Sequence, residues 1–319
     1  MVLPALASAL LLAGLALGAL HFGRQALLAP GPLAAATDVV VPHGSLAGIA
    51  EALAQAGVIR HPLALRAAAW WSRDAGPLHA GEFRFPAHAS LRATLAVLRT
   101  ARPVQHRLTI AEGLTAAQIA ALFNDDNLLT GPPVTLQEGA VLPETYAYER
   151  GDTRAAVLAR AERAMDKALA AAWAGRAEGI GLSGPRQMLI LASIVERETA
   201  KPEERPMIAA VFLNRLRQGM RLQSDPTVVY AVTGGSFVLD RKLSRADLDS
   251  DSPYNTYRIP GLPPGPIDSP GRASLNAVAH PADSDALYFV ADGSGGHAFA
   301  RTLAEHNRNV AKWRAIQEK

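Results

Sequence analysis

Two glutamates near the middle of the chain have the residue type and the setting for acid–base chemistry. Glu196 and Glu198 end the segment Gln187-Met-Leu-Ile-Leu-Ala-Ser-Ile-Val-Glu-Arg-Glu-Thr, which is almost wholly apolar before them. Burial beside apolar groups disfavours the charged form of a carboxyl group and raises its pKa. Such a group still carries its proton near neutral pH, so it can act as a general acid.

The sequence pattern alone does not separate these two carboxyl groups. Helical spacing puts Glu196 on the face of Ala192 and Ser193, whereas Glu198 follows another apolar face. The alternative is that both lie at the exposed end of a core helix and pair with a basic neighbour such as Arg197. Spacing therefore permits a general acid in this segment. It does not decide between a buried general acid and two exposed glutamates that pair with basic neighbours.

The composition excludes several other kinds of site. None of the 319 residues is cysteine, so thiol catalysis, disulfides and cysteine-ligated metals are excluded. The net charge of +3 comes with no clustered basic stripe, which indicates no nucleic-acid partner. His280 and His297 fit no metal motif and are expected to be structural. The run Gly293–Gly296 lacks the lysine of a P-loop, so we predict neither a metal nor a cofactor.

The elements that must position the two glutamates can be predicted from pattern. The apolar run is expected to form a helix buried almost all round, with Ser183 as its cap and Pro185 in its first turn. A helix over 153–173 precedes it, and the segment Leu142-Pro-Glu-Thr-Tyr-Ala-Tyr is expected to be a compact loop. Asp225-Pro226 has the composition of a turn.

A strand–turn–helix unit occurs twice in the first part of the chain. Asp38-Val-Val-Val precedes a helix capped by Ser45, and about seventy residues later Arg107-Leu-Thr-Ile precedes a helix capped by Thr115. Between the copies we predict a helix over 61–73, a strand or hairpin over 81–86 and a helix over 90–100. This order is typical of a small α+β module that binds or positions a ligand.

The N-terminal sequence has the character of a membrane segment. The run from Val2 to Leu20 contains no charged residue, and a helix of that length would span about 28 Å, close to the hydrocarbon thickness of a bilayer. Its alanines and glycines also permit cleavage as a signal segment. Residues 23–37 are rich in Ala, Pro and Gly and are expected to be a linker.

The segment around the two glutamates resembles a known family. Ala192-Ser-Ile-Val-Glu-Arg-Glu-Thr is similar to the signature of the YceG-like, MltG-type endolytic murein transglycosylases. The resemblance continues in the family's order and spacing over about 140–315. It runs through Val211-Phe-Leu-Asn-Arg-Leu, Met220-Arg-Leu-Gln-Ser-Asp-Pro-Thr-Val, Lys242-Leu-Ser-Arg-Ala-Asp-Leu, Tyr254-Asn-Thr-Tyr, Gly261-Leu-Pro-Pro-Gly-Pro-Ile, Ala279-His-Pro and Tyr288-Phe-Val-Ala-Asp-Gly-Ser-Gly-Gly-His.

The resemblance implies an organisation and a set of site residues. It implies an α+β protein with a transmembrane anchor or signal segment at 1–22, the linker, a LysM-like module at 38–104 and a mixed helix and sheet catalytic domain at 105–319. That last domain includes the second repeat at 107–123. Glu196 occupies the Ile-Val-Glu position and is expected to be the catalytic residue. Substrate-binding neighbours are expected at Asn214, Asp225, Tyr254, Asn255 and Tyr257.

The resemblance also implies a reaction and a location. The family cleaves the bond between N-acetylmuramic acid and N-acetylglucosamine in nascent glycan strands, leaves 1,6-anhydro ends, and is thought to terminate strand growth beside the peptidoglycan synthases. We therefore expect a single-pass protein of the inner (cytoplasmic) membrane whose catalytic part faces the periplasm and binds glycan strands.

Two alternatives remain open. One is a non-catalytic peptidoglycan-binding protein that uses the LysM-like module. The other is aminodeoxychorismate lyase, an older label for this family, which would require pyridoxal phosphate, a Schiff-base lysine and a cytosolic location. Lys167, Lys201 and Lys242 lie in ordinary polar contexts, which argues against that chemistry.

Overall fold

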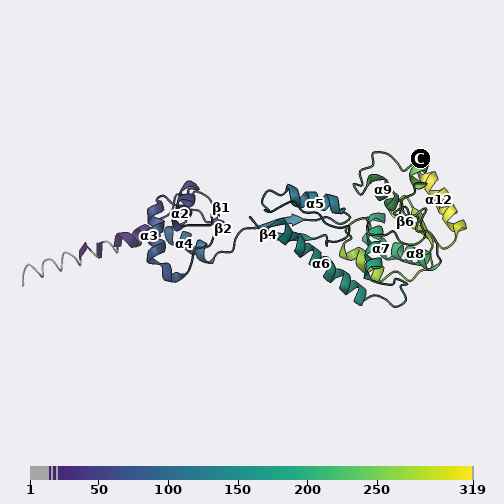
Figure 1. The fold of residues 1–319 in the computed structure, drawn as a ribbon, viewed down its shortest axis with the longest axis horizontal. Coiled ribbons are helices and arrows are strands. Elements are labelled where there is room, and N and C mark those ends of the chain that lie inside the picture. The colour runs from purple at the N-terminus through teal and green to yellow at the C-terminus, as the bar shows by residue number, and fades with distance from the viewer. Residues whose placement is uncertain (1–13, 16, 19–20, 318–319) are drawn as a thin grey trace, which may run out of the picture. The chain divides into compact units, whose positions relative to one another are not determined.

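The computed structural model describes residues 14–15, 17–18 and 21–317 (Figure 1). The apolar run predicted as an anchor or signal segment lies largely outside these residues. Among the residues that are described, no helix is both long enough and apolar enough to cross a membrane. The chain divides into two compact units. The first runs to His106 and includes Tyr148–Gly151, and the second comprises Arg107–Ala147 and the chain from Asp152 onward.

The first unit packs three helices on a two-stranded sheet. Strands β1 (Thr37–Val41) and β2 (Gly81–Phe85) pair antiparallel, with Val39 opposite Phe83. Helices α2 (Leu46–Gln55), α3 (Pro62–Trp71) and α4 (Leu91–Thr100) surround it, with a 3₁₀ turn, η1 (Arg73–Ala75), after α3. These elements confirm the predicted strands and helices. The predicted cap of α2 is also present, because the Ser45 hydroxyl accepts a hydrogen bond from the Gly48 N–H at 3.2 Å.

Strands β3 (Gln105–Thr109) and β4 (Thr145–Glu149) form a second two-stranded sheet. The prediction of a loop over 142–148 was wrong at β4. Leu142-Pro-Glu does turn the chain, but Tyr146 and Tyr148 then alternate inward with exposed neighbours, which is the period of a strand. Helix α5 (Ala116–Asp125) follows β3 and has a complete capping box between Thr115 and Gln118.

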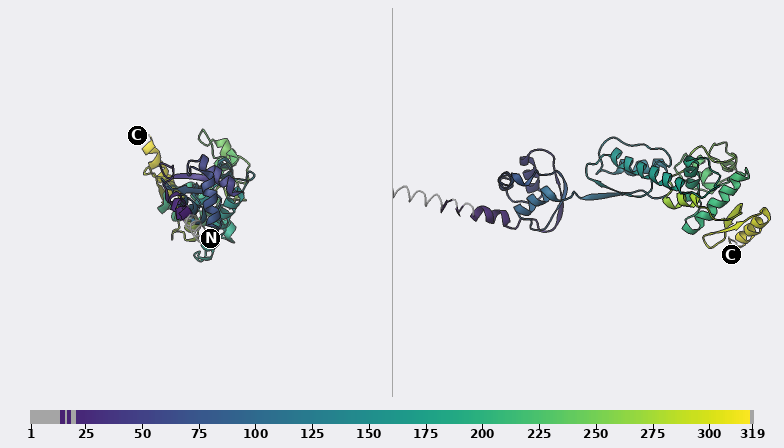
Figure 2. Two further views of the ribbon diagram at one scale, coloured as in Figure 1. Left: turned by 90° about the vertical axis from the view of Figure 1, so that its left-hand side faces the viewer. Right: turned by 90° about the horizontal axis from the view of Figure 1, so that it is seen from below.

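The second unit has a hydrophobic core formed by its helices (Figures 1 and 2). Helices α6 (Arg154–Ala174), α7 (Pro185–Glu198), α8 (Arg205–Arg217) and α11 (Arg272–Ala279) share one hydrophobic core. A hairpin of β5 (Tyr288–Ala291) and β6 (His297–Ala300) carries α12 (Leu303–Gln317) beside it, as the right-hand view of Figure 2 shows. The mixed helix and sheet content confirms the α+β class.

Two local predictions in the second unit need correction. Gly184, not Ser183, is the N-cap of α7. Glycine has no side chain that could form a capping bond, and Pro185 at the first position has no amide donor that would need one. Asp225-Pro226 does not form a turn. It opens α9 (Asp225–Thr233), since proline also suits the first turn of a helix. The short elements η2 (Pro202–Glu204) and α10 (Arg245–Leu248) complete the unit.

Candidate functional site

Helix α7 carries both glutamates at its C-terminal end. Its residues from Ile190 to Glu196 are all buried, as the predicted apolar pattern requires. The Ser193 hydroxyl is fixed within this core, since it donates to the Ile190 carbonyl at 2.7 Å and accepts from the Ile267 N–H at 3.1 Å. Burial of these residues and the two Ser193 hydrogen bonds fix the helix in the core, and its last turn carries the two carboxyl groups.

Glu196 is buried, as predicted, and both of its carboxyl oxygens are hydrogen-bonded within the protein. Its Oε1 accepts a hydrogen bond from Arg205 Nη2 at 2.7 Å, and its Oε2 accepts one from the Gly271 N–H at 2.9 Å. Arg205 is itself buried at the start of α8, and Gly271 is the N-cap of α11. A guanidinium and a helix N-terminus both stabilise a carboxylate. With both carboxyl oxygens occupied by these contacts, the geometry suits a structural role for Glu196.

Glu198 has the environment expected of a general acid. It ends α7, is half-buried, and accepts a hydrogen bond at Oε2 from the Ser224 hydroxyl at 2.8 Å. Desolvation raises the pKa of Glu198 to about 7, the negative charge of Asp225 adds to the rise, and the Ser224 bond and Arg215 oppose it. A carboxyl group with this pKa is part protonated at neutral pH, so it can give up and take back a proton.

Asp225 and Tyr257 lie near Glu198. The Tyr257 hydroxyl donates to Asp225 Oδ1 at 2.6 Å, and Asp225 is exposed at the start of α9. Burial, and next the bond to Asp225, raise the pKa of Tyr257, so this hydroxyl stays protonated. The described side chains thus place a carboxylate and a phenol next to the protonatable Glu198.

A strained turn positions Ser224 and Asp225. Gln223 has a φ of 49°, an unusual value for a residue with a side chain, and its N–H donates to the Thr256 carbonyl at 3.1 Å. The Thr256 hydroxyl in turn accepts from the Ser224 N–H at 3.0 Å. Backbone strain of this kind costs about 1–3 kcal/mol and persists where the surroundings fix it, often at functional sites.

The other predicted substrate-binding residues have their polar groups engaged within the protein. Asn214 is buried and donates to the carbonyls of Ser284 and Ala286 at 2.8 and 2.9 Å. Asn255 is buried and donates to the Leu248 and Ser250 carbonyls. Tyr254 packs on Tyr230, with ring centroids 4.8 Å apart. Of the predicted set, the structure brings only Asp225 and Tyr257 to Glu198.

The sequence analysis did not identify three residues of this region. Arg205 could have been sought as the counter-charge that a buried Glu196 requires. Ser224 directly precedes Asp225, which was predicted to bind substrate, so Ser224 could have been proposed together with it. Nothing in the sequence indicated a role for Asp268. It is buried with neither carboxyl oxygen hydrogen-bonded, and burial, together with the nearby Glu196 charge, raises its pKa well above the usual range.

The described residues contain no group of three or more His, Asp or Glu side chains suited to a metal ion. His297 Nδ1 lies 2.7 Å from Glu204 Oε2, which is a structural pairing, and His280 is exposed. Lys201 Nζ donates to the Ser294 carbonyl at 3.3 Å.

Comparison with known proteins assigns the chain to a family. The model of the YceG-like family matches residues 39–312. An endolytic murein transglycosylase of Bacillus subtilis (strain 168) is 38% identical over 176 residues, which cover 55% of this chain and 48% of the relative. The protein of the same name from Streptococcus pneumoniae serotype 2 is 30% identical and covers 86% of this chain and 58% of the relative. The chain thus spans about half the length of these relatives.

A solved structure supports the same relationship. The crystal structure of a putative yceG-like protein from Listeria monocytogenes superimposes with a TM-score of 0.53 at 28% identity, over 86% of this chain and 98% of the other. The family match extends over most of both units and includes every residue of the site described above. The chain belongs to the YceG-like family.

Proposed function

We propose that this chain is an endolytic lytic transglycosylase of peptidoglycan and that Glu198 is its proton donor and acceptor. Its substrate is the bond between N-acetylmuramic acid and N-acetylglucosamine in nascent glycan strands. The observation that carries the proposal is the carboxyl group of Glu198, whose pKa is raised to about 7 beside Ser224 and Asp225. Membership of a family whose named relatives are endolytic murein transglycosylases supports the substrate.

A single carboxyl group is sufficient for this reaction. Protonated Glu198 gives its proton to the glycosidic oxygen as the bond to the muramoyl C1 breaks. The C6 hydroxyl of the same sugar then attacks C1, and its proton passes to the Glu198 carboxylate. The product is a 1,6-anhydro end, no water is consumed, and the acid is restored. Hydrolases that use water need a second carboxylate at a fixed separation.

The groups beside Glu198 suit the charge that develops. The transition state resembles an oxocarbenium ion, and the exposed carboxylate of Asp225 favours positive charge nearby. The hydroxyl of Tyr257 fixes the orientation of that carboxylate through its 2.6 Å hydrogen bond. Both residues were predicted to bind substrate, and we retain them in that role.

Glu196 has a different role in this proposal from the one the sequence suggested. Its bonds to Arg205 and Gly271 tie the end of α7 to the first residues of α8 and α11. We propose that this ion pair fixes the position of Glu198, two residues further on. The earlier expectation, that Glu196 itself transfers the proton, is the alternative that the variants in the Discussion separate.

The finer organisation also belongs to this proposal. The uncharged run from Val2 to Leu20 would anchor the chain in the inner membrane, with both units on the periplasmic side near the synthases. The two-stranded, three-helix first unit would be a LysM-like module that positions the glycan. Cleavage beside the synthases would end strand growth.

The products of a glycan digest test the reaction. Incubation of the full chain with purified glycan strands should yield internal fragments with 1,6-anhydromuramoyl ends, identified by liquid chromatography and mass spectrometry. Reducing ends in place of anhydro ends would show hydrolysis and contradict the mechanism. No cleavage by correctly folded protein would favour the non-catalytic binding alternative.

Two substitutions next to Glu198 should move the pH profile in opposite directions. Activity depends on the protonated form, so it is expected to fall as the pH rises through about 7. Ser224→Ala removes a hydrogen bond that stabilises the carboxylate, so the falling limb should shift upward by roughly one pH unit. Asp225→Asn removes a repelling charge, so the limb should shift downward. Profiles of kcat against pH check both, and shifts in the same direction would contradict the assignment.

A further inference from the structure

An exposed apolar stripe follows one face of α3 in the first unit. Leu63, Trp70 and Trp71 stand at positions i, i+7 and i+8 and therefore share a face of the helix. They are 72%, 64% and 73% exposed, whereas Leu65 and Ala69 on the opposite face are buried in the core. Large apolar side chains gathered on one helix face indicate an interaction surface.

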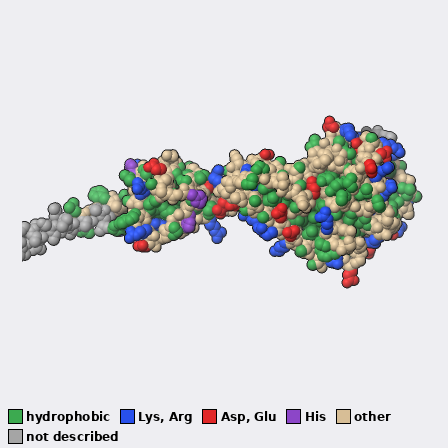
Figure 3. Space-filling model, viewed as in Figure 1, with side chains coloured by type: hydrophobic (Ala, Val, Ile, Leu, Met, Phe, Trp, Pro, Cys, Tyr) green, Lys and Arg blue, Asp and Glu red, His purple; other side chains and the backbone are tan. Residues whose placement is uncertain are grey.

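Basic side chains accompany this stripe. Residues 60–75 contain three arginines, Arg60, Arg66 and Arg73, and a single acid, Asp74. The Arg73 guanidinium lies over the Trp70 ring, 5.0 Å from its centroid. In Figure 3, green hydrophobic and blue basic side chains lie side by side on the first unit. Of the three arginines, Arg66 lies within α3, and Arg60 and Arg73 flank its two ends. Tryptophan accompanied by arginine is typical of helices that lie at a membrane surface.

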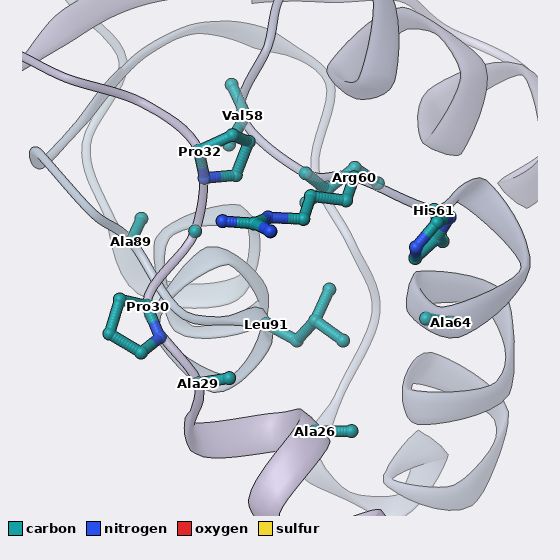
Figure 4. Close-up of a pocket in the computed structure, with 12 residues that line it drawn as sticks. Ala26, Ala29, Pro30, Pro32, Val58, Arg60, His61, Ala64, Ala89 and Leu91 are labelled. Carbon is teal, nitrogen blue, oxygen red and sulfur yellow. The ribbon is translucent and has the colours of Figure 1, made fainter.

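Two cavities open between α3 and the short helix over 21–28. Their volumes are about 510 and 540 Å³, and both are lined by Ala26, Ala64 and Leu91. Figure 4 shows the Arg60 side chain extending into the first cavity among Ala, Pro and Leu side chains. Arg24 lines the second cavity, and no carboxylate is among the described residues that line either one. An apolar cavity with an arginine in its lining is suited to bind an acyl chain that carries an anionic headgroup.

In the sequence, this face lies close after the run predicted as a membrane anchor. The helix over 21–28 directly follows the uncharged run from Val2 to Leu20. Gly23 and Leu27 of that helix line the same cavity as Trp71 of α3. If the run lies in the membrane, the α3 face is within side-chain contact of the first residues outside it.

We infer that the α3 face of Leu63, Trp70 and Trp71 rests in the interfacial layer of the membrane. The tryptophans lie at the headgroup level, the arginines contact anionic phospholipid, and the cavities receive the upper part of acyl chains. The inference rests on the membrane anchoring in the proposed function. It assigns the first unit a second task, which is to hold the chain at the bilayer surface.

Tryptophan quenching by brominated lipid tests this contact in the full chain. The protein is reconstituted into phosphatidylcholine and phosphatidylglycerol vesicles with or without bromine on the acyl chains. The chain has four tryptophans, so a Trp173→Phe/Trp313→Phe variant reports only on α3. Its matched control, Trp70→Phe/Trp71→Phe, keeps the apolar face but reports only on the second unit. We expect bromine to remove more than roughly half of the emission of the first variant, because interfacial tryptophans lie near the acyl chains, and little of the second.

Flotation of the vesicles tests the membrane anchor separately from the contact of the α3 face with lipid. Protein that floats and shows α3 quenching supports the inference. Protein that floats without α3 quenching overturns the inference and leaves the anchor and the enzymatic proposal standing. Protein that does not float refutes the anchor and the inference together, while the digest assay still judges the reaction. A shift of α3 emission caused by free glycan strands but not by lipid would make this face a glycan surface and overturn the inference.

Discussion

Glu198→Gln is expected to lower kcat on glycan strands by about 10²- to 10⁴-fold, the range for loss of a general acid. Glutamine keeps the shape of the side chain and can still accept the hydrogen bond from Ser224, but it has no proton to transfer. The residue is half-buried with a carboxyl pKa of about 7, so a neutral amide fits the folded site, and the free energy of unfolding should change by less than about 1 kcal/mol. Single-turnover digestion and thermal unfolding measure the two effects.

Glu196→Gln is the matched control for that experiment. It alters a carboxylate two residues away on the same helix, which the structure pairs with Arg205 and the Gly271 N–H. We expect a lower midpoint of unfolding and a much smaller loss of kcat in the folded fraction. A loss of activity confined to Glu196→Gln would restore Glu196 as the proton donor, as the family signature first suggested.

Arg205→Ala is expected to destabilise the second unit by about 3–5 kcal/mol, the usual cost of stranding one partner of a buried ion pair. Arg205 and Glu196 are 9% and 4% exposed at the side chain, with 2.7 Å between Nη2 and Oε1. Without the guanidinium, the carboxylate loses its counter-charge where water cannot replace it. Urea unfolding measures the loss, and acid, which protonates the stranded carboxylate, should relieve part of it.

A second arginine in the same unit provides the control. Arg272 pairs with Glu144 at 2.8 Å, but the two side chains are 57% and 41% exposed. Exposed ion pairs contribute about 0–1 kcal/mol, so Arg272→Ala should have little effect. Equal losses in the two variants would show that burial of the Glu196 pair is not what stabilises α7.

Much of the local structure was predictable because it depends on contacts between near neighbours in sequence. The caps of Ser45 and Thr115 and the strand β1 each follow from a few adjacent residues, and the apolar run of α7 required a buried helix. The strand β4 was missed because its segment of aromatic and acidic residues was expected to form a compact loop, and its partner β3 lies about forty residues earlier. Pairing across that distance is not visible in a local pattern.

The division of roles between the two glutamates was not predictable, because it depends on residues distant in the chain. Arg205 and Gly271 reach Glu196 from 9 and 75 residues away, and Ser224 reaches Glu198 from 26. Periodicity indicated that a carboxyl group would be buried, but burial alone does not say whether that group is neutralised by a proton or by an arginine. The residues that contact each carboxyl group in the folded chain decide between these two possibilities.

The most direct test of the central claim is to follow the glutamate carboxyl groups themselves. Carbon-13 NMR of protein labelled at the glutamate side-chain carboxyl should reveal one resonance that titrates near pH 7. We predict that this resonance disappears in Glu198→Gln and persists in Glu196→Gln. If the neutral titration disappears instead in Glu196→Gln, or if no glutamate titrates above about pH 5, the proton resides elsewhere and the assignment of Glu198 is contradicted.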